Sequence, residues 1–299
     1  MELCLGTVQF GMDYGIKGQK QPSLDDSVKM LDYAVQNGIK SIDTARAYGT
    51  AEEVVGEFLK RKTISRDKLF ISSKFKPNSL DDVKPKDYKK VIKEHLENQL
   101  KILNTDYLDS YMFHSSRYAF DEEKLYAMYE VKKEGKIRHC GVSVYYPDEA
   151  HICIESPYVD FIQLPSSIFD QRMRKEGIFD LALQNGSTQI HSRSAFIQGL
   201  ILMNENEVPD FLKDAKPILN KIEKMCKKYN ISRIELAIAY VKQFNAISHL
   251  VFGVDNIEQL KENIKIFEND FSLDILKEIG NEFEHLETSI IMPSLWVKK

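Results

Sequence analysis

The chain has 299 residues, 43% of them hydrophobic, which suits one large α/β domain or two smaller ones with a sizeable core. A formal net charge of −4 gives no basic footprint for nucleic acid. No apolar run reaches the roughly 18 residues that span a bilayer, and the start lacks the features of a signal peptide. The four scattered cysteines show neither metal-ligand spacing nor a disulfide framework. We therefore expect a cytoplasmic protein with no nucleic-acid or membrane partner.

Apolar runs alternate with amphipathic segments along the chain. The runs predict strands at 3–7, 39–43, 69–74, 107–113, 137–142, 159–163, 189–192 and 249–252. The amphipathic segments predict helices at 24–37, 51–60, 84–103, 122–135, 147–154, 177–185, 215–228, 232–243, 257–267 and 273–284. The tail 290–299 is expected to be irregular. No flexible linker or short repeat divides the chain.

This alternation predicts the fold class. About eight strands alternating with helices match the (β/α)8 TIM barrel of about 250 residues. A doubly wound sheet is the rival, and it would carry a Gly-rich phosphate turn after its first strand. The segment from Gly6 to Gly11 reads GTVQFG and is not that motif. We therefore predict an α/β fold, a single-domain TIM barrel over residues 1–299.

Four polar residues follow three of these apolar runs. Asp43 and Tyr48 come at or just after the second predicted strand, Lys74 ends the third, and His114 follows the fourth. Parallel strands linked by helices place their C-terminal ends on one face, where barrels build their active sites. Each residue alone is more simply a turn cap, a solvated strand end or a loop histidine. The convergence of all four on one face favours a catalytic site.

These four side chains together suit proton donation to a substrate oxygen. A free phenol titrates near ~10, so Tyr48 needs a neighbour that stabilises its phenolate, and the Lys74 ammonium can do so. A buried lysine in turn needs a carboxylate partner, a role that Asp43 fits. His114 adds a donor that can orient a carbonyl. Because the sequence shows no metal cluster, we expect the oxygen's charge to come from a hydride, which requires a nicotinamide or a flavin.

Several spaced motifs extend this pattern over nearly the whole chain. They are Gly6-Thr7, Ser41-Ile42-Asp43-Thr44-Ala45, Tyr48-Gly49, Ser73-Lys74, Leu108-Asp109 with His114, Gly135-Lys136-Ile137-Arg138, Gly141-Val142-Ser143, Gln198-Gly199-Leu200 and Gln259-Leu260-Lys261-Glu262-Asn263. In these motifs the chain resembles the aldo-keto reductase superfamily. The resemblance implies a barrel that binds NADP(H) across its C-terminal mouth and acts on a small carbonyl substrate. It also implies Tyr48 as proton donor, Lys74 and Asp43 as its tuning pair, and His114 as carbonyl orienter.

The resemblance also implies a set of cofactor contacts. They are Gly6, Thr7, Asp43, Ser143, Gln163, Arg193, Gly253, Gln259, Glu262 and Asn263. Ser143 and Gln163 match the positions that hold the nicotinamide carboxamide, although the Asn usual after that serine is Val144. Arg193 stands where many relatives stack an aromatic ring on the nicotinamide. Its guanidinium can stack in the same way, or it can be a salt-bridged strand end.

The expected phosphate end of the cofactor site is the segment 252–256. Many relatives carry a basic residue and a serine here for the extra phosphate of NADP, whereas this chain has Gly253, Val254 and Asp255. Gln259 fits an adenosine contact, but it also forms a capping-box-like pair with Asn256. We favour NADP(H) from the resemblance and keep NAD(H) open.

The predicted activity is reduction of an aldehyde or ketone to an alcohol. The polar loops 115–120 and 143–147 point to a sugar or sugar derivative as substrate. The aromatic residues Phe10, Tyr14, Tyr118 and Trp296 could line the mouth, although ordinary packing at the rim is the simpler interpretation of each one alone. Two alternatives remain: a cofactor-sensing regulatory protein with little turnover, and a barrel lyase or isomerase that uses Lys74 as a Schiff base.

Overall fold

Eight parallel strands close into a barrel in the computed structural model, which describes residues 1–296. Each strand pairs with its neighbours in sequence, and β8 pairs with β1 to complete the ring. The strands are β1 (Glu2–Gly6), β2 (Ser41–Asp43), β3 (Phe70–Phe75), β4 (Leu108–Phe113), β5 (Ile137–Ser143), β6 (Phe161–Pro165), β7 (Gln189–Arg193) and β8 (Ile247–Phe252). The fold is therefore a single-domain TIM barrel, as the sequence predicts.

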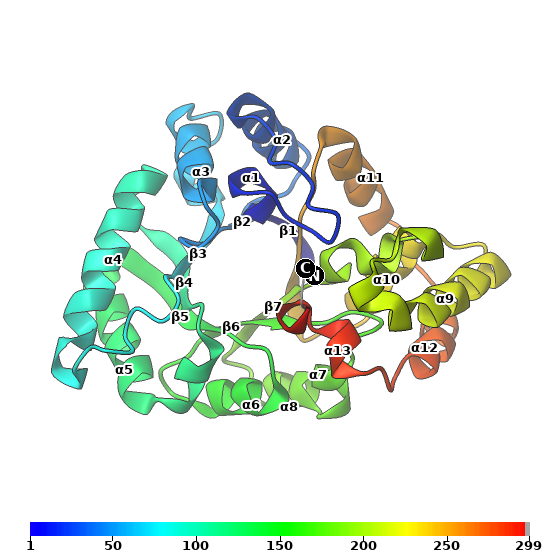
Figure 1. The fold of residues 1–299 in the computed structure, drawn as a ribbon. Helices are drawn as coiled ribbons and strands as arrows, with labels where there is room; N and C mark the ends of the chain where they lie inside the picture. The colour runs from blue at the N-terminus through cyan, green and yellow to red at the C-terminus, as the bar shows by residue number, and fades with distance from the viewer. Residues whose placement is uncertain (297–299) are drawn as a thin grey trace.

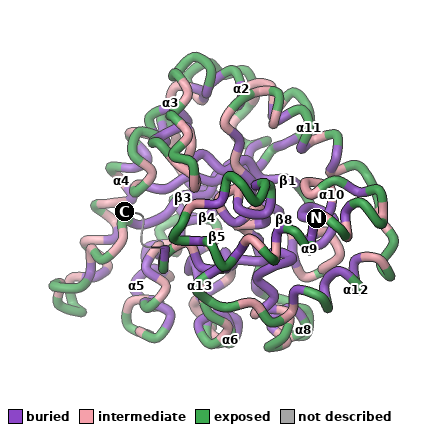
Figure 2. The backbone as a smooth tube through the Cα atoms, turned by 45° about the vertical axis from the view of Figure 1, so that its right-hand side comes forward, coloured by how far each residue is buried: buried purple, intermediate pink, exposed green. Residues whose placement is uncertain are grey.

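Helices surround the ring of strands, as Figure 1 shows in a view down the barrel. The α-helices are α1 (Val8–Gly11), α2 (Leu24–Gln36), α3 (Ala51–Lys60), α4 (Tyr88–Leu103), α5 (Glu122–Val131), α6 (Pro147–Glu155), α7 (Arg172–Lys175), α8 (Ile178–Asn185), α9 (Lys216–Tyr229), α10 (Arg233–Lys242), α11 (Ile257–Phe267), α12 (Leu273–Glu282) and α13 (Thr288–Ile291). Most strands are buried along their length, whereas the surrounding helices alternate between buried and exposed faces (Figure 2). None of the helices within residues 1–296 is long and apolar enough to cross a membrane.

All eight predicted strands are present, and their bounds differ from the predictions by no more than two residues. Two helices differ more. α4 begins at Tyr88 because Pro85 opens a separate 3-10 turn before it. α5 ends at Val131, and a π-turn carries the chain to Gly135, whose φ of 89° ends the helical path. The predicted irregular tail begins within the short helix α13 and includes a 3-10 turn, and its last residues, 297–299, lie outside the described part.

Candidate active site

A buried ion pair joins the C-terminal ends of β2 and β3. The Lys74 Nζ lies 2.8 Å and 2.7 Å from the two oxygens of Asp43, and it also donates to the Thr44 carbonyl at 3.1 Å. Lys74 is fully buried. Burial lowers the pKa of this ammonium, but the carboxylate of Asp43 and the phenol of Tyr48 raise it, so the net pKa lies above the usual value. The lysine therefore stays charged beneath the barrel mouth.

Tyr48 lies over this ion pair in the loop between β2 and α3. The Nζ of Lys74 is 5.0 Å from the centre of its ring, and the His114 ring meets it edge-on with 5.7 Å between centres. A close approach from α1 fixes the loop, because a Cβ on Gly11 would come within 1.7 Å of the Tyr48 carbonyl oxygen. Tyr48, Lys74 and His114 thus converge as the sequence predicts.

The protonation states of these groups suit an acid and a neutral donor. Burial raises the pKa of Tyr48; Lys74 lowers it in part, but the net pKa lies above the ordinary value. The lysine acts in the expected direction, yet burial outweighs it. Burial, with the charges of Lys74 and Arg193, lowers the pKa of His114 to about 3. At neutral pH the phenol therefore carries its proton and the imidazole is uncharged.

A second layer of hydrogen bonds supports the end of β3 from the α4 side. Gln99 on α4 donates to the Lys74 carbonyl at 3.2 Å and to Glu52 Oε1 at 2.6 Å. The Ser73 hydroxyl donates to the same Glu52 oxygen at 2.7 Å, and the second Glu52 oxygen pairs with Arg46 at 3.1 Å. This network holds the backbone of Lys74 in place without touching the cavity.

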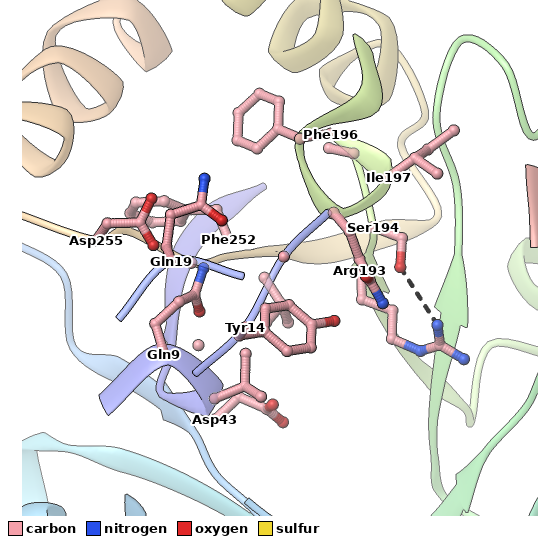
Figure 3. A pocket seen from close by; sticks show the side chains of 18 of the residues that line it. Gln9, Tyr14, Gln19, Asp43, Arg193, Ser194, Phe196, Ile197, Phe252 and Asp255 are labelled. Carbon is pink, nitrogen blue, oxygen red and sulfur yellow. Dashed lines mark hydrogen bonds between the residues drawn. The ribbon is translucent and has the colours of Figure 1, made fainter. Parts of the chain in front are cut away.

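A cavity of about 520 Å³ opens above these residues at the barrel mouth. Every predicted cofactor residue lines it: Gly6, Thr7, Asp43, Ser143, Gln163, Arg193, Gly253, Gln259, Glu262 and Asn263. Tyr48 and His114 line it as well, whereas Lys74 lies behind the wall. Figure 3 shows Asp43, Tyr14 and Arg193 facing the space, with Asp255 on the far side. All the predicted site residues except Lys74 therefore line one pocket.

Two of the predicted cofactor residues also hold Asp43 in position. Thr7 Oγ1 donates to the Asp43 carbonyl at 3.0 Å. The Gln163 amide donates to Asp43 Oδ1 at 2.7 Å. The carboxylate is thus held by Lys74 and Gln163 together, a contact that the sequence did not predict.

Of the two alternatives for Arg193 at the end of β7, the salt bridge is not formed. No carboxylate within residues 1–296 lies at ion-pair distance from its guanidinium. The guanidinium instead stacks over the Tyr145 ring, 4.3 Å from its centre, and donates to the Val144 carbonyl at 3.0 Å. Stacking on a nicotinamide stays a prediction.

Three of the four aromatic residues considered for the mouth pack elsewhere, in line with the simpler interpretation of each. Tyr14 lines the cavity, but Phe10, Tyr118 and Trp296 do not. Phe10 packs in the core, the Tyr118 hydroxyl bonds to Asp81, and the Trp296 indole donates to the Ser289 carbonyl. An aromatic residue near a strand end can serve the core as readily as a pocket.

Sequence reasoning missed several cavity residues, among them Gln9 and Gln19. Buried Oε1 atoms of Gln9 and Gln19, like Nδ1 of His114, have no partner among the described residues. Unpaired buried polar atoms in one cavity fit a polar ligand, since such atoms are costly unless bonded. Gly253 leaves room for Gln9, because a Cβ there would lie 2.3 Å from its Oε1. The residues present therefore fit a dinucleotide. Among the described residues, no cluster that could hold a metal ion is present.

Comparison with known proteins agrees with this geometry. The Aldo/keto reductase family model matches residues 2–281. The aldo-keto reductase YhdN of Bacillus subtilis is 28% identical over 86% of this chain and 87% of its own. The NADH-specific methylglyoxal reductase of Escherichia coli K12 is 25% identical over 83% of this chain and 85% of its own. The structure of aldo-keto reductase AKR11C1 from Bacillus halodurans, in its holo form, superposes with a TM-score of 0.76 at 22% identity, covering 97% of this chain and 95% of that one. The chain belongs to the aldo/keto reductase family.

Proposed function

We propose that the chain reduces an aldehyde or ketone to an alcohol, with Tyr48 as the proton donor. The observation that carries the proposal is the position of the Lys74 ammonium, which pairs with Asp43 and lies 5.0 Å from the centre of the Tyr48 ring. Tyr48 and His114 both line the cavity above it. A reduced nicotinamide bound in the cavity would supply the hydride. Family membership supports an oxidoreductase that uses such a cofactor.

The protein residues act on the carbonyl oxygen. The Tyr48 hydroxyl and a ring N–H of His114 donate hydrogen bonds to it and polarise the carbonyl. As negative charge develops on the oxygen, Tyr48 transfers its proton there. The Lys74 ammonium stabilises the phenolate that remains, and Asp43 keeps that ammonium charged. In the oxidative direction the same groups act in reverse.

The cofactor would lie along the residues that line the cavity. Ser143 and Gln163 would hold the carboxamide of the nicotinamide, and the Gln259, Glu262 and Asn263 side chains would contact the adenosine end. The family resemblance favours NADP(H), while one relative is an NADH-specific reductase.

A small carbonyl compound is the proposed substrate. Methylglyoxal belongs first in a test panel because a relative is named for its reduction. A sugar derivative is the second class, and here the support is uneven. Ser143 and Tyr145 of the loop 143–147 line the cavity, whereas no residue of the loop 115–120 does. A cytoplasmic location stays a prediction of the sequence.

The buried position of Lys74 argues against Schiff-base chemistry. Its side chain is fully buried and bonds to both oxygens of Asp43 and to the Thr44 carbonyl. An amine that attacks a carbonyl must be neutral and accessible, and this one is neither.

Titration with NADH and NADPH, followed by turnover of a carbonyl panel, tests the proposal. Tyr48→Phe should bind the cofactor normally and lose roughly 10²–10⁴-fold in kcat. Tyr126→Phe, an exposed tyrosine on α5, is the matched control and should keep full activity. Full turnover by Tyr48→Phe would refute the assigned acid. Tight dinucleotide binding by the wild type without turnover on any carbonyl would favour the regulatory alternative.

A further inference from the structure

The cavity carries an unusual balance of charge at the end formed by α11. Asp255, just before this helix, and Glu262, within it, both line the cavity. Two basic residues also line it, Lys17 and Arg193. Lys17 already pairs with Glu207 at 2.5 Å, and Arg193 lies across the pocket from Asp255 in Figure 3. The α11 end is therefore acidic, because Lys17 is already paired and Arg193, which has no carboxylate partner within residues 1–296, lies on the opposite side of the cavity.

The α11 end is where the adenosine half of a dinucleotide must lie, if the proposed function holds. The hydride has to reach a carbonyl held by Tyr48 and His114, so the nicotinamide occupies that end of the cavity. From there the lining continues over the turn after β1 and the end of β8 to α11. The extended cofactor thus places its adenosine ribose near Asp255 and Glu262.

Asp255 is fixed in place by hydrogen bonds to α11. Its backbone N–H donates to Gln259 Oε1 at 2.8 Å, and the Gln259 amide donates to Asp255 Oδ2 at 3.3 Å. Asn256 caps the helix by accepting the Gln259 N–H at 2.9 Å. Neither Asp255 nor Glu262 has an ion-pair partner in the described part of the chain. No cation of residues 1–296 is therefore paired with either carboxylate.

NADP(H) and NAD(H) differ by one phosphate on the adenosine ribose, and this phosphate carries about −1.5 to −2 charges at neutral pH, like other phosphomonoesters. At the α11 end it would meet two carboxylates, whereas a free ribose hydroxyl could donate a hydrogen bond to one of them. The N-terminus of α11 attracts anions, but its exposed N–H groups are partly taken by the caps from Asn256 and Gln259. We infer that this chain selects NAD(H) over NADP(H), reversing the preference that the family resemblance favours.

Binding measurements test this inference without relying on turnover. Fluorescence or calorimetric titration of the wild type should give a Kd for NADPH at least about tenfold above that for NADH, as expected for repulsion between close charges of one sign. Because salt screens such repulsion, the ratio should shrink as ionic strength rises.

Variants connect the selectivity to the two carboxylates. The substitutions Asp255→Asn and Glu262→Gln remove the charges but keep the side-chain shapes. The double variant should lower the ratio of the NADPH Kd to the NADH Kd at least about fivefold, and this ratio should no longer depend on salt. Glu258→Gln is the matched control, since this exposed carboxylate in the first turn of α11 does not line the cavity. It should leave the ratio unchanged.

The possible failures are distinguishable. Binding of NADPH as tight as that of NADH by the wild type would overturn the inference while leaving carbonyl reduction intact. An unchanged ratio in the double variant would also overturn it, because the selectivity would then arise elsewhere. Failure of both dinucleotides to bind would overturn the proposed function itself.

Discussion

The two ends of the barrel bury titratable side chains in opposite ways. At the C-terminal end, Lys74 is fully buried, keeps its charge and donates to the Asp43 carboxylate and the Thr44 carbonyl. The Asp43 carboxylate also accepts a hydrogen bond from Gln163. At the other end, His191 is also fully buried, and neither ring nitrogen has a partner within residues 1–296. One end holds a charge with many bonds, and the other holds an imidazole with none.

The surroundings of His191 explain how this is possible. Its ring lies 4.5 Å from that of Phe161, 5.5 Å from that of Phe70 and 4.1 Å from that of His249, measured between centres. Burial, with the neighbouring His249, Lys74 and His139, lowers the pKa of His191 well below its usual value. The imidazole is therefore neutral and packs like an aromatic ring.

The paired charge of Lys74 fits a role in the proposed chemistry, whereas the neutral ring of His191 fits a role in packing. A buried charge is costly unless it is paired, and the Lys74–Asp43 pair places one beneath the mouth, where the phenolate of the proposed reaction would need it. A neutral ring can fill the far end of the barrel at a smaller cost. Breaking the paired charge should therefore have large effects, and altering the neutral ring should have smaller ones.

The largest expected effect comes from Lys74→Met, which leaves the Asp43 carboxylate buried with only the Gln163 amide as a side-chain partner. Losing one member of a buried pair typically costs about 3–5 kcal/mol, so the free energy of unfolding should fall by about that amount. Carbonyl reduction should be lost as well. Urea unfolding and single-turnover assays measure the two effects.

Two further variants test whether the effect arises from the loss of the buried ion pair. Lys76→Met removes an exposed lysine two residues later and should change little. Adding Asp43→Asn to Lys74→Met removes the unpaired charge, so it should restore much of the stability but not the activity. Unfolding of Lys74→Met at the wild-type urea concentration would contradict the assigned role of the pair.

At the far end, His191 should make stability depend on pH. Unfolded histidine titrates near ~6.5, whereas burial lowers the folded pKa of His191 well below that value. Below pH ~6.5 the unfolded chain therefore binds a proton that the folded chain does not, and stability falls by up to about 1.4 kcal/mol per pH unit for this group. His114 and His249 add to the slope, since burial lowers their pKa values too.

His191→Leu should remove one histidine from this slope while keeping the apolar packing. Between pH 6 and 5 the loss of stability should shrink by up to about 1.4 kcal/mol per pH unit, and activity at neutral pH should be kept. His151→Leu, which replaces an exposed ring on α6, should leave the slope as it is. An unchanged slope in His191→Leu would mean that its imidazole takes up a proton in the folded state.

The sequence predicted much of the mouth because strand ends are recognisable. Asp43, Lys74 and His114 each end or follow an apolar run, so the fold alone brings them to one face. The far end was not predicted, because His139 and His191 within strands carry no signal of their neighbours. Both rings contact Phe70 on β3, a strand distant in sequence from β5 and β7.

Side-chain direction was the second limit on prediction. The sequence left open whether Phe10 and Tyr118 line the mouth or pack, and in the structure both are buried away from the cavity. It gave Gln163 to the cofactor and missed its bond to Asp43, which joins residues 120 positions apart. Rotamers and long-range pairs of this kind arise from packing, which a pattern of residue types does not encode.

Arg193 offers the smallest test, because it is a cation at the mouth that lacks a carboxylate partner. Its guanidinium contacts the Tyr145 ring, the Val144 carbonyl and the Ser194 hydroxyl, all uncharged. Arg193→Met should therefore change the free energy of unfolding by less than about 1.5 kcal/mol, the usual net worth of such bonds. NMR titration should find the pKa of His114 raised in this variant, because the positive charge of Arg193 lowers that pKa. The rise should be modest, because burial and Lys74 lower the pKa more than Arg193 does. A loss of stability as large as that of Lys74→Met would show that a cation at the mouth stabilises the fold even without a carboxylate partner. The pairing of Lys74 with Asp43 would then not explain why the mouth differs from the site of His191.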